Sequence, residues 1–172
     1  MSTREFESRT AFEDFPTVWQ RVVTDPLGFF AAMPETGGLQ PPAIFLAICA
    51  AINAAGHLLS FAGLRGMLSI FLWQLIAAFM MAALFVLIAQ NLFAGRAGFE
   101  PTFKIVAYSW APLIIAWVPV VGGIAVIYSV YLMIRGLERV QGLEATHAVL
   151  TVLLGAGALF ALGIIGIGPR WL

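Results

Sequence analysis

The chain has 172 residues, of which 61% are hydrophobic and 10% are charged, against the roughly 25% of charged residues found in soluble domains. This composition excludes an ordinary soluble domain and indicates a membrane protein with apolar tracts long enough to cross about 30 Å of hydrocarbon. The nine acidic and nine basic residues leave no net charge, so nothing suggests a nucleic-acid partner. Cys49 is the only cysteine, which excludes an intrachain disulfide and a multi-thiolate metal site.

The first forty residues form an N-terminal segment without the continuous apolar core of a secretory signal peptide, and we expect this segment, 1–40, to be cytoplasmic. Within it, apolar residues recur at helical spacing and predict an amphipathic helix. This helix either lies in the membrane interface or packs against the ends of the other helices. Asp25 and Pro26 predict the cap and first residue of a second short helix over 27–33. The apolar stripe consists of Phe15, Val18, Trp19, Val22 and Val23.

The rest of the chain, 41–172, is predicted to form one membrane domain, an all-α polytopic bundle with five transmembrane helices. The first two spans, at about 43–63 and 67–93, are separated by only three residues, which forces a hairpin. The last span, at about 146–168, is rich in glycine and ends at a proline followed by Arg170 and a tryptophan suited to the interface.

Between these spans lies a stretch, uncharged from residue 105 to 134, that cannot be a single helix. One helix from residue 103 to 134 would be about 48 Å long and would hold two prolines and a Gly-Gly pair in its interior. The breakers therefore predict a hairpin of two short spans, about 103–118 and 120–135. Each arm is below the roughly 20 residues of an ordinary span, so the hairpin either thins the bilayer or stops short of its far face. The predicted turn residues are Pro112, Pro119, Gly122 and Gly123.

The distribution of basic residues favours five passes over four. With five passes, seven basic residues lie on the side of the N-terminus and two on the other side, whereas four passes give six and three. Basic residues concentrate on the cytoplasmic side, so we expect the N-terminus in the cytoplasm and the C-terminus outside. The seven are Arg4, Arg9, Arg21, Arg96, Lys104, Arg135 and Arg139, and the two are Arg65 and Arg170.

Two polar residues, Asn53 and His57, lie four apart on one face of the first span, and this face is expected to point into protein or water. A proton relay or ligand site is one interpretation. The favoured one is an interhelical hydrogen bond, because no aspartate or glutamate lies inside any predicted span to complete a relay.

Small residues recur at four-residue spacing in the spans and predict faces on which helices approach closely, within the chain or against a partner. No metal, phosphate-loop, dinucleotide or nucleophile-base motif occurs, so we expect neither catalytic residues nor a metal or other cofactor. The candidate packing face consists of Ala47, Ala51, Ala55, Gly157 and Ala161.

Three stretches together resemble the bacterial branch of the Yip membrane protein family, whose eukaryotic members interact with Ypt/Rab GTPases. They are "VWQRVVTDPLGFF", "TFKIVAYSWAPLIIAWVPVVGGIAVIYSVYLMIRGLERVQGL" and "ATHAVLTVLLG", and they extend over about 18–163. The resemblance implies five spans, a cytosolic N-terminus and no enzymatic activity. The chain has "TGGLQPP" where the eukaryotic members have an acidic-Tyr-Gly-Pro stretch, and it lacks their long cytosolic region, which argues against a Rab-type GTPase partner.

These observations lead us to expect a non-enzymatic protein of the bacterial inner membrane. Its expected partners are the lipid bilayer and either other membrane subunits or a second copy of itself, for which it would act as an accessory or scaffold subunit. Two alternatives are a small transporter or channel, with the broken hairpin and the face of Asn53 and His57 lining a path, and a membrane-shaping or trafficking-type protein.

Overall fold

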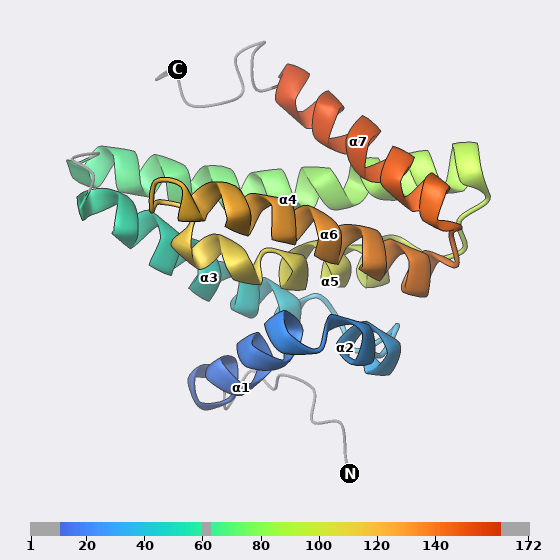
Figure 1. Cartoon of the computed structure of the whole chain (residues 1–172), viewed down its shortest axis with the longest axis horizontal. Helices are drawn as coiled ribbons and strands as arrows, with labels where there is room; N and C mark the ends of the chain where they lie inside the picture. The colour runs from blue at the N-terminus through green and yellow to red at the C-terminus, as the bar shows by residue number, and fades with distance from the viewer. Residues whose placement is uncertain (1–10, 60–62, 163–172) are drawn as a thin grey trace.

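The computed structural model describes residues 11–59 and 63–162, which form seven α-helices and one short 3-10 helix (Figure 1). The described residues contain no strand, so the prediction of an all-helical fold is confirmed. The end of the predicted last span and Arg4, Arg9 and Arg170 lie outside the described residues. The helices are α1 (Ala11–Thr24), α2 (Pro26–Ala32), α3 (Gln40–Leu59), α4 (Gly63–Phe93), α5 (Phe99–Ser109), η1 (Ala111–Ile115), α6 (Val121–Gln141) and α7 (Ala145–Leu162).

Within the described residues, four helices are long and apolar enough to cross a membrane, namely α3, α4, α6 and α7. The prediction of five transmembrane helices, two of them in a short hairpin, is therefore met only in part. The third predicted span is instead the 11-residue helix α5 followed by the five-residue 3-10 helix η1. The reason is Pro112, which has no N–H to donate into a helix and also disfavours helical geometry at the residue before it.

The short arm and α6 run antiparallel as a hairpin. Near its start, Thr102 of α5 contacts the end of α6 through Gln141, and near its end Ser109 contacts Ser129 in the middle of α6. The chain reverses direction between η1 and α6, where the amide of Gly122 donates to the carbonyl of Val118 at 2.7 Å.

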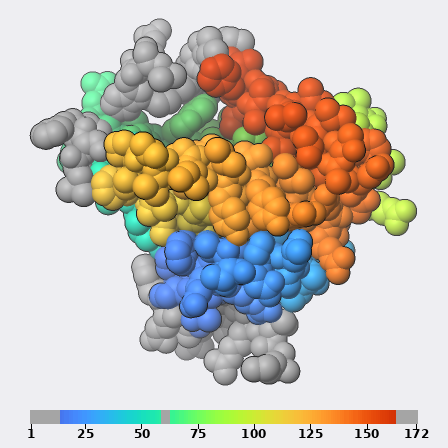
Figure 2. Space-filling model, viewed as in Figure 1, coloured from blue at the N-terminus to red at the C-terminus, as the bar shows by residue number. Residues whose placement is uncertain are grey.

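The two N-terminal helices lie together along one flank of the bundle, against α3, the α5–η1 arm and α6 (Figure 1). Figure 2 shows this pair, in blue, directly against α6, in orange, while α7, in red, lies on the other side of α6. We call α1 and α2 the N-terminal arm. The amphipathic pattern of α1 explains its position, because Val22 is fully buried and the ring of Phe15 lies 5.1 Å from that of Phe45 on α3.

The core is built around α4, whose inner face carries small residues and one large ring. Ala78, Ala82 and Phe85 are fully buried, and Phe85 fills the space beside Gly155 of α7. A methyl group on Gly155 would come within 2.5 Å of that ring, so the glycine is what lets α7 approach α4 so closely. Between α4 and α7, Gly155 therefore sets the distance between the helices.

Candidate functional site: a broken helix at the centre of the bundle

The α5–η1 arm is the most enclosed part of the described chain. Every residue from Pro101 to Pro112 is buried, although the helix breaks at Trp110 within this stretch. A break of this kind removes backbone hydrogen bonds, and in a membrane interior the freed groups require partners from the protein. The partners of these groups decide whether the break is a binding site or a structural joint.

Three backbone carbonyls at the break accept hydrogen bonds from side chains of three other helices. Because each donor comes from a different helix, the break fixes the relative positions of α1, α3 and α6. The bonds run from Ser129 Oγ to the Ser109 oxygen at 2.7 Å, from Trp19 Nε1 to the Ala111 oxygen at 2.9 Å and from Asn53 Nδ2 to the Leu113 oxygen.

A fourth helix reaches the break indirectly. Gln74 of α4 donates its side-chain N–H to Asn53 Oδ1 at 3.1 Å, so that α3, α4 and η1 are joined by one chain of hydrogen bonds. Two buried oxygens beside this network accept or donate no hydrogen bond within the described residues, Gln74 Oε1 and Ser109 Oγ. The three carbonyls at the break therefore all accept hydrogen bonds, whereas two buried polar side-chain atoms beside it have no hydrogen-bond partner within the described residues.

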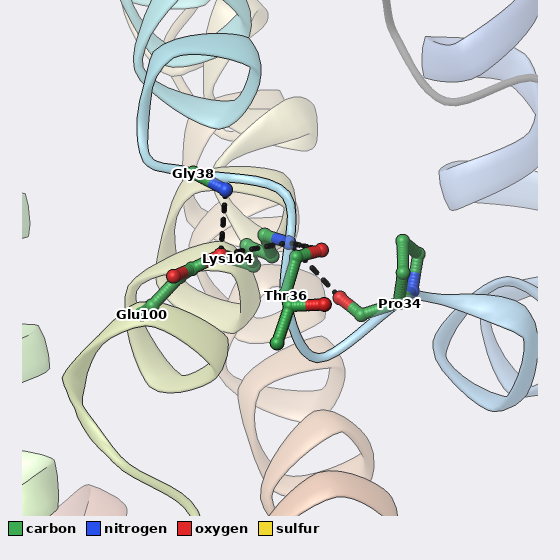
Figure 3. Close-up of polar contacts among 5 residues, drawn as sticks. All are labelled: Pro34, Thr36, Gly38, Glu100 and Lys104. Atoms are coloured by element: carbon green, nitrogen blue, oxygen red, sulfur yellow. Dashed lines mark hydrogen bonds and ion pairs between the residues drawn. The ribbon is translucent and has the colours of Figure 1, made fainter.

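The start of α5 holds the linker between α2 and α3. Lys104 is 2% exposed, and its ammonium donates to the carbonyls of Pro34 and Thr36 at 3.0 and 2.8 Å (Figure 3). Its Nζ also lies 3.4 Å from Glu100 Oε1, which accepts a 2.7 Å hydrogen bond from the amide of Gly38. A buried ammonium needs such partners, because removing it from water without them is costly. The cluster therefore ties the N-terminal arm to the centre of the bundle.

The loop before α5 is held in a similar way by a buried amide. Gln141, 1% exposed, accepts from the Ala97 amide at 2.9 Å and donates to the Ala97 carbonyl at 3.2 Å and to Thr102 Oγ1 at 2.8 Å. Gln90 of α4 donates to the same carbonyl from an exposed position. The end of α6 thus fixes the turn from α4 into α5.

The chemistry available at the break is that of a structural joint. Unwound carbonyls can coordinate cations in transporters, but here the carbonyls of Ser109, Ala111 and Leu113 each accept from a side chain of the protein. Among the described residues, no three His, Cys, Asp or Glu side chains gather where they could hold a metal ion.

The two polar residues predicted on the first span have different surroundings. Asn53 is 1% exposed and caps the break as an interhelical hydrogen-bond donor, whereas His57, one turn further along α3, is half-buried. Trp117 packs beside them, over Gly56, where a methyl group would come within 2.2 Å of the indole. The structure therefore brings Asn53 to the site and places His57 at its edge.

The amphipathic stripe of α1 faces the bundle. Trp19 caps the break, and the carbonyl of Val23 accepts a 2.6 Å hydrogen bond from the Tyr128 hydroxyl of α6. Phe15, Val18 and Val22 also pack against the core. Of the two interpretations of this stripe, the geometry corresponds to packing against the other helices.

The predicted small-residue face is largely directed outward. Ala51, Ala55, Gly157 and Ala161 are exposed and Ala47 is half-buried, while Ala50 and Ala54 of the same helix α3 are buried.

The predicted turn residues are distributed over three elements. Pro112 lies in η1, Pro119 lies in the reversal itself, and Gly122 and Gly123 lie in the first turn of α6. A methyl group on Gly122 would come within 2.2 Å of the Ala116 carbonyl oxygen, so this glycine permits the close approach of the two arms.

Sequence reasoning missed three residues that hold the joint, Lys104, Ser129 and Gln141. A signal existed for Lys104, because it is the only lysine of the chain and begins an uncharged stretch of thirty residues. Ser129 lies on a predicted span and Gln141 lies six residues after one. Ser129 bonds a backbone carbonyl, and Gln141 bonds the Ala97 backbone and the Thr102 hydroxyl, and no sequence motif reveals these distant partners.

The fold and the joint define a multi-pass, all-helical membrane protein. The family model described as Yip1 domain matches residues 21–167, which is most of the chain, and the protein belongs to this family. The predicted family is thereby confirmed. Neither the curated proteins nor the solved structures contained a match to the chain.

Proposed function

We propose that this Yip1-domain protein is a non-enzymatic accessory or scaffold subunit of a larger membrane complex. The proposal places it in a bacterial inner membrane, with the N-terminus in the cytoplasm and the C-terminus outside, and includes no cofactor, nucleic acid or Rab-type GTPase. The observation that carries it is the use of buried polar groups. Asn53, Lys104 and Gln141 all serve to join helices and linkers within the chain.

The outer surface supports the same proposal. The outward side of α4 is an apolar stripe at four-residue spacing, Leu64, Leu68, Leu72 and Ile76, which suits contact with lipid or with other transmembrane helices. The exposed small residues Ala55 and Gly157 differ from this stripe, because they would let a second helix approach closely. A methyl group on Gly157 would meet no atom of the described chain within 4 Å, so its space is open to a partner.

The test is a purification from native membranes in mild detergent, with mass spectrometry of the proteins that remain bound at near-equal stoichiometry. We expect a fixed set of membrane subunits, and we expect Ala55→Phe or Gly157→Phe to release them. Leu153→Phe is the matched control, because Leu153 is 61% exposed on α7 and already bulky. Recovery of a lone monomer from the native membranes would contradict the proposal.

One observation favours a small transporter or channel as a second candidate, namely the two open polar atoms at the break, Gln74 Oε1 and Ser109 Oγ. This candidate requires that Asn53 and Gln74 line a path. Flux of ions or small solutes in liposomes, abolished by Asn53→Leu in a protein that stays folded, would support it. No flux of any solute in a panel of ions and small solutes would contradict the transporter or channel candidate.

A further inference from the structure

The tip of the α5–α6 hairpin has a surface that is unusual for a turn. All side chains from Leu113 to Ile127 are apolar except for the indole N–H of Trp117. Several of them project from the protein, with exposed fractions of 83% for Val120, 64% for Ile124 and 72% for Ile127. Turns that face water are normally rich in polar residues, which hydrogen-bond to the local backbone, so this composition points to an apolar environment.

Three backbone amides of the tip donate to carbonyls within the tip, as an apolar environment favours. Val120 has φ 69° and ψ −55°, and the amide of Val121 donates to the Pro119 carbonyl at 2.8 Å, which is a γ-turn with positive φ at its centre. Such a conformation is strained for a β-branched residue. The amides of Val118 and Gly122 also donate within the tip, at 3.0 and 2.7 Å. Hydrocarbon demands such internal partners, whereas water would satisfy the amides of a relaxed turn.

The uncharged part of the hairpin is also shorter than the hydrocarbon is thick, although α6 as a whole is long enough to count as a span by length and composition. Between the tip and Arg135, α6 has fourteen uncharged residues, about 21 Å of helix, against about 30 Å of hydrocarbon. By contrast, α4 has 25 uncharged residues from Gly66 to Gln90, which is about 38 Å of helix. Figure 1 shows that α3 and α4 extend further than the hairpin at the end where they meet.

We propose that the tip, residues 115–124, is embedded in the hydrocarbon of the leaflet on the Arg65 side and contacts lipid acyl chains. The hairpin then enters the membrane from the side of the α4–α5 loop and returns without reaching water on the far side. Lipid is favoured over a protein partner, because protein interfaces carry about one hydrogen bond per 100–200 Å² and the exposed side chains of the tip have no polar atom. This inference goes beyond the proposed scaffold function and requires no partner subunit.

The experiment is site-directed spin labelling of the full chain, purified and reconstituted into liposomes of a single phosphatidylcholine. The background variant is Cys49→Ala, which removes the only native thiol, itself buried. A nitroxide is attached at Val120→Cys, and its accessibility to oxygen and to a water-soluble nickel chelate is measured. Leu72→Cys, at a site 56% exposed and two turns along α4 from Arg65, is the lipid control, and Arg65→Cys is the water control.

We expect the Val120 label to match the Leu72 label, with high accessibility to oxygen and low accessibility to nickel. Nickel accessibility equal to that of the Arg65 label would overturn the proposal, because the tip would then lie in water. Low accessibility to both reagents would also overturn it, because a second copy of the protein would then cover the tip. If Val120→Cys fails to fold, a label at Ile124→Cys, within the regular helix α6, reports the same accessibilities, and the same three outcomes apply.

Discussion

Replacing Asn53 with leucine tests whether the helix break is a structural joint. The substitution removes the donor to the Leu113 carbonyl and the acceptor of Gln74, at a site 1% exposed where no water can replace them. A buried polar group left without a partner costs about 1–3 kcal/mol. Polar contacts between membrane helices average about 0.6 kcal/mol, because the unfolded chain in the membrane also finds partners. With two groups affected, we expect the free energy of unfolding to fall by about 2 kcal/mol.

The same geometry predicts a different result for Gln74→Leu. The Gln74 amide makes one hydrogen bond and leaves its oxygen without a partner, so removing it loses one bond and also relieves one buried unsatisfied group. We expect a change of less than about 1 kcal/mol. The double variant Asn53→Leu/Gln74→Leu should then be less destabilised than Asn53→Leu alone, because it no longer carries the stranded glutamine.

The assay is unfolding by increasing SDS in mixed micelles, followed by tryptophan fluorescence, for the parent and the three variants. Gln90→Leu is the control, because Gln90 is an exposed glutamine on the same helix as Gln74. Additive losses in the double variant, or a loss for Gln74→Leu as large as that for Asn53→Leu, would refute the reasoning. Either result would mean that Asn53 does not cap the break with Gln74 holding its side chain in place.

Three further predictions use the same unfolding assay. Gln141→Leu should lower the free energy of unfolding by about 2–4 kcal/mol and Gln90→Leu by much less, because the Gln141 amide is buried with three hydrogen bonds and the Gln90 amide is exposed with one. Equal losses for the two variants would contradict this. Gly56→Ala should cost about 1–3 kcal/mol through its clash with the indole packed on it, whereas Gly123→Ala, with open space around it, should be neutral or stabilising. Val120→Gly should stabilise the protein by about 1 kcal/mol, because glycine relieves the positive φ and little packing is lost; destabilisation would show that the turn is not strained.

The helical elements follow from local signals that the sequence carries openly. Asp25 accepts from the Gly28 amide at 3.1 Å and caps α2, as the Asp25-Pro26 pair predicts. Uninterrupted apolar tracts predict α4 and α7, because length and hydropathy alone define a candidate span. The structure of the third predicted span is harder to predict, because Pro112 shows that a helix must break and does not show that the residues around it continue as η1.

The contacts at the break could not be predicted, because they join backbone atoms to side chains that are distant in the sequence. Trp19 and Ala111 are separated by 92 positions, and a tryptophan on an amphipathic helix is equally typical of the membrane interface. The position of the N-terminal arm depends instead on which backbone carbonyls at the break lack a partner in their own helix, and the residue at which α5 ends decides that. The family match begins at residue 21, so it covers α2 and the last four residues of α1. An N-terminal arm that donates to a carbonyl of the break from one flank, and accepts from α6 in turn, is therefore packed as a structural part of the bundle.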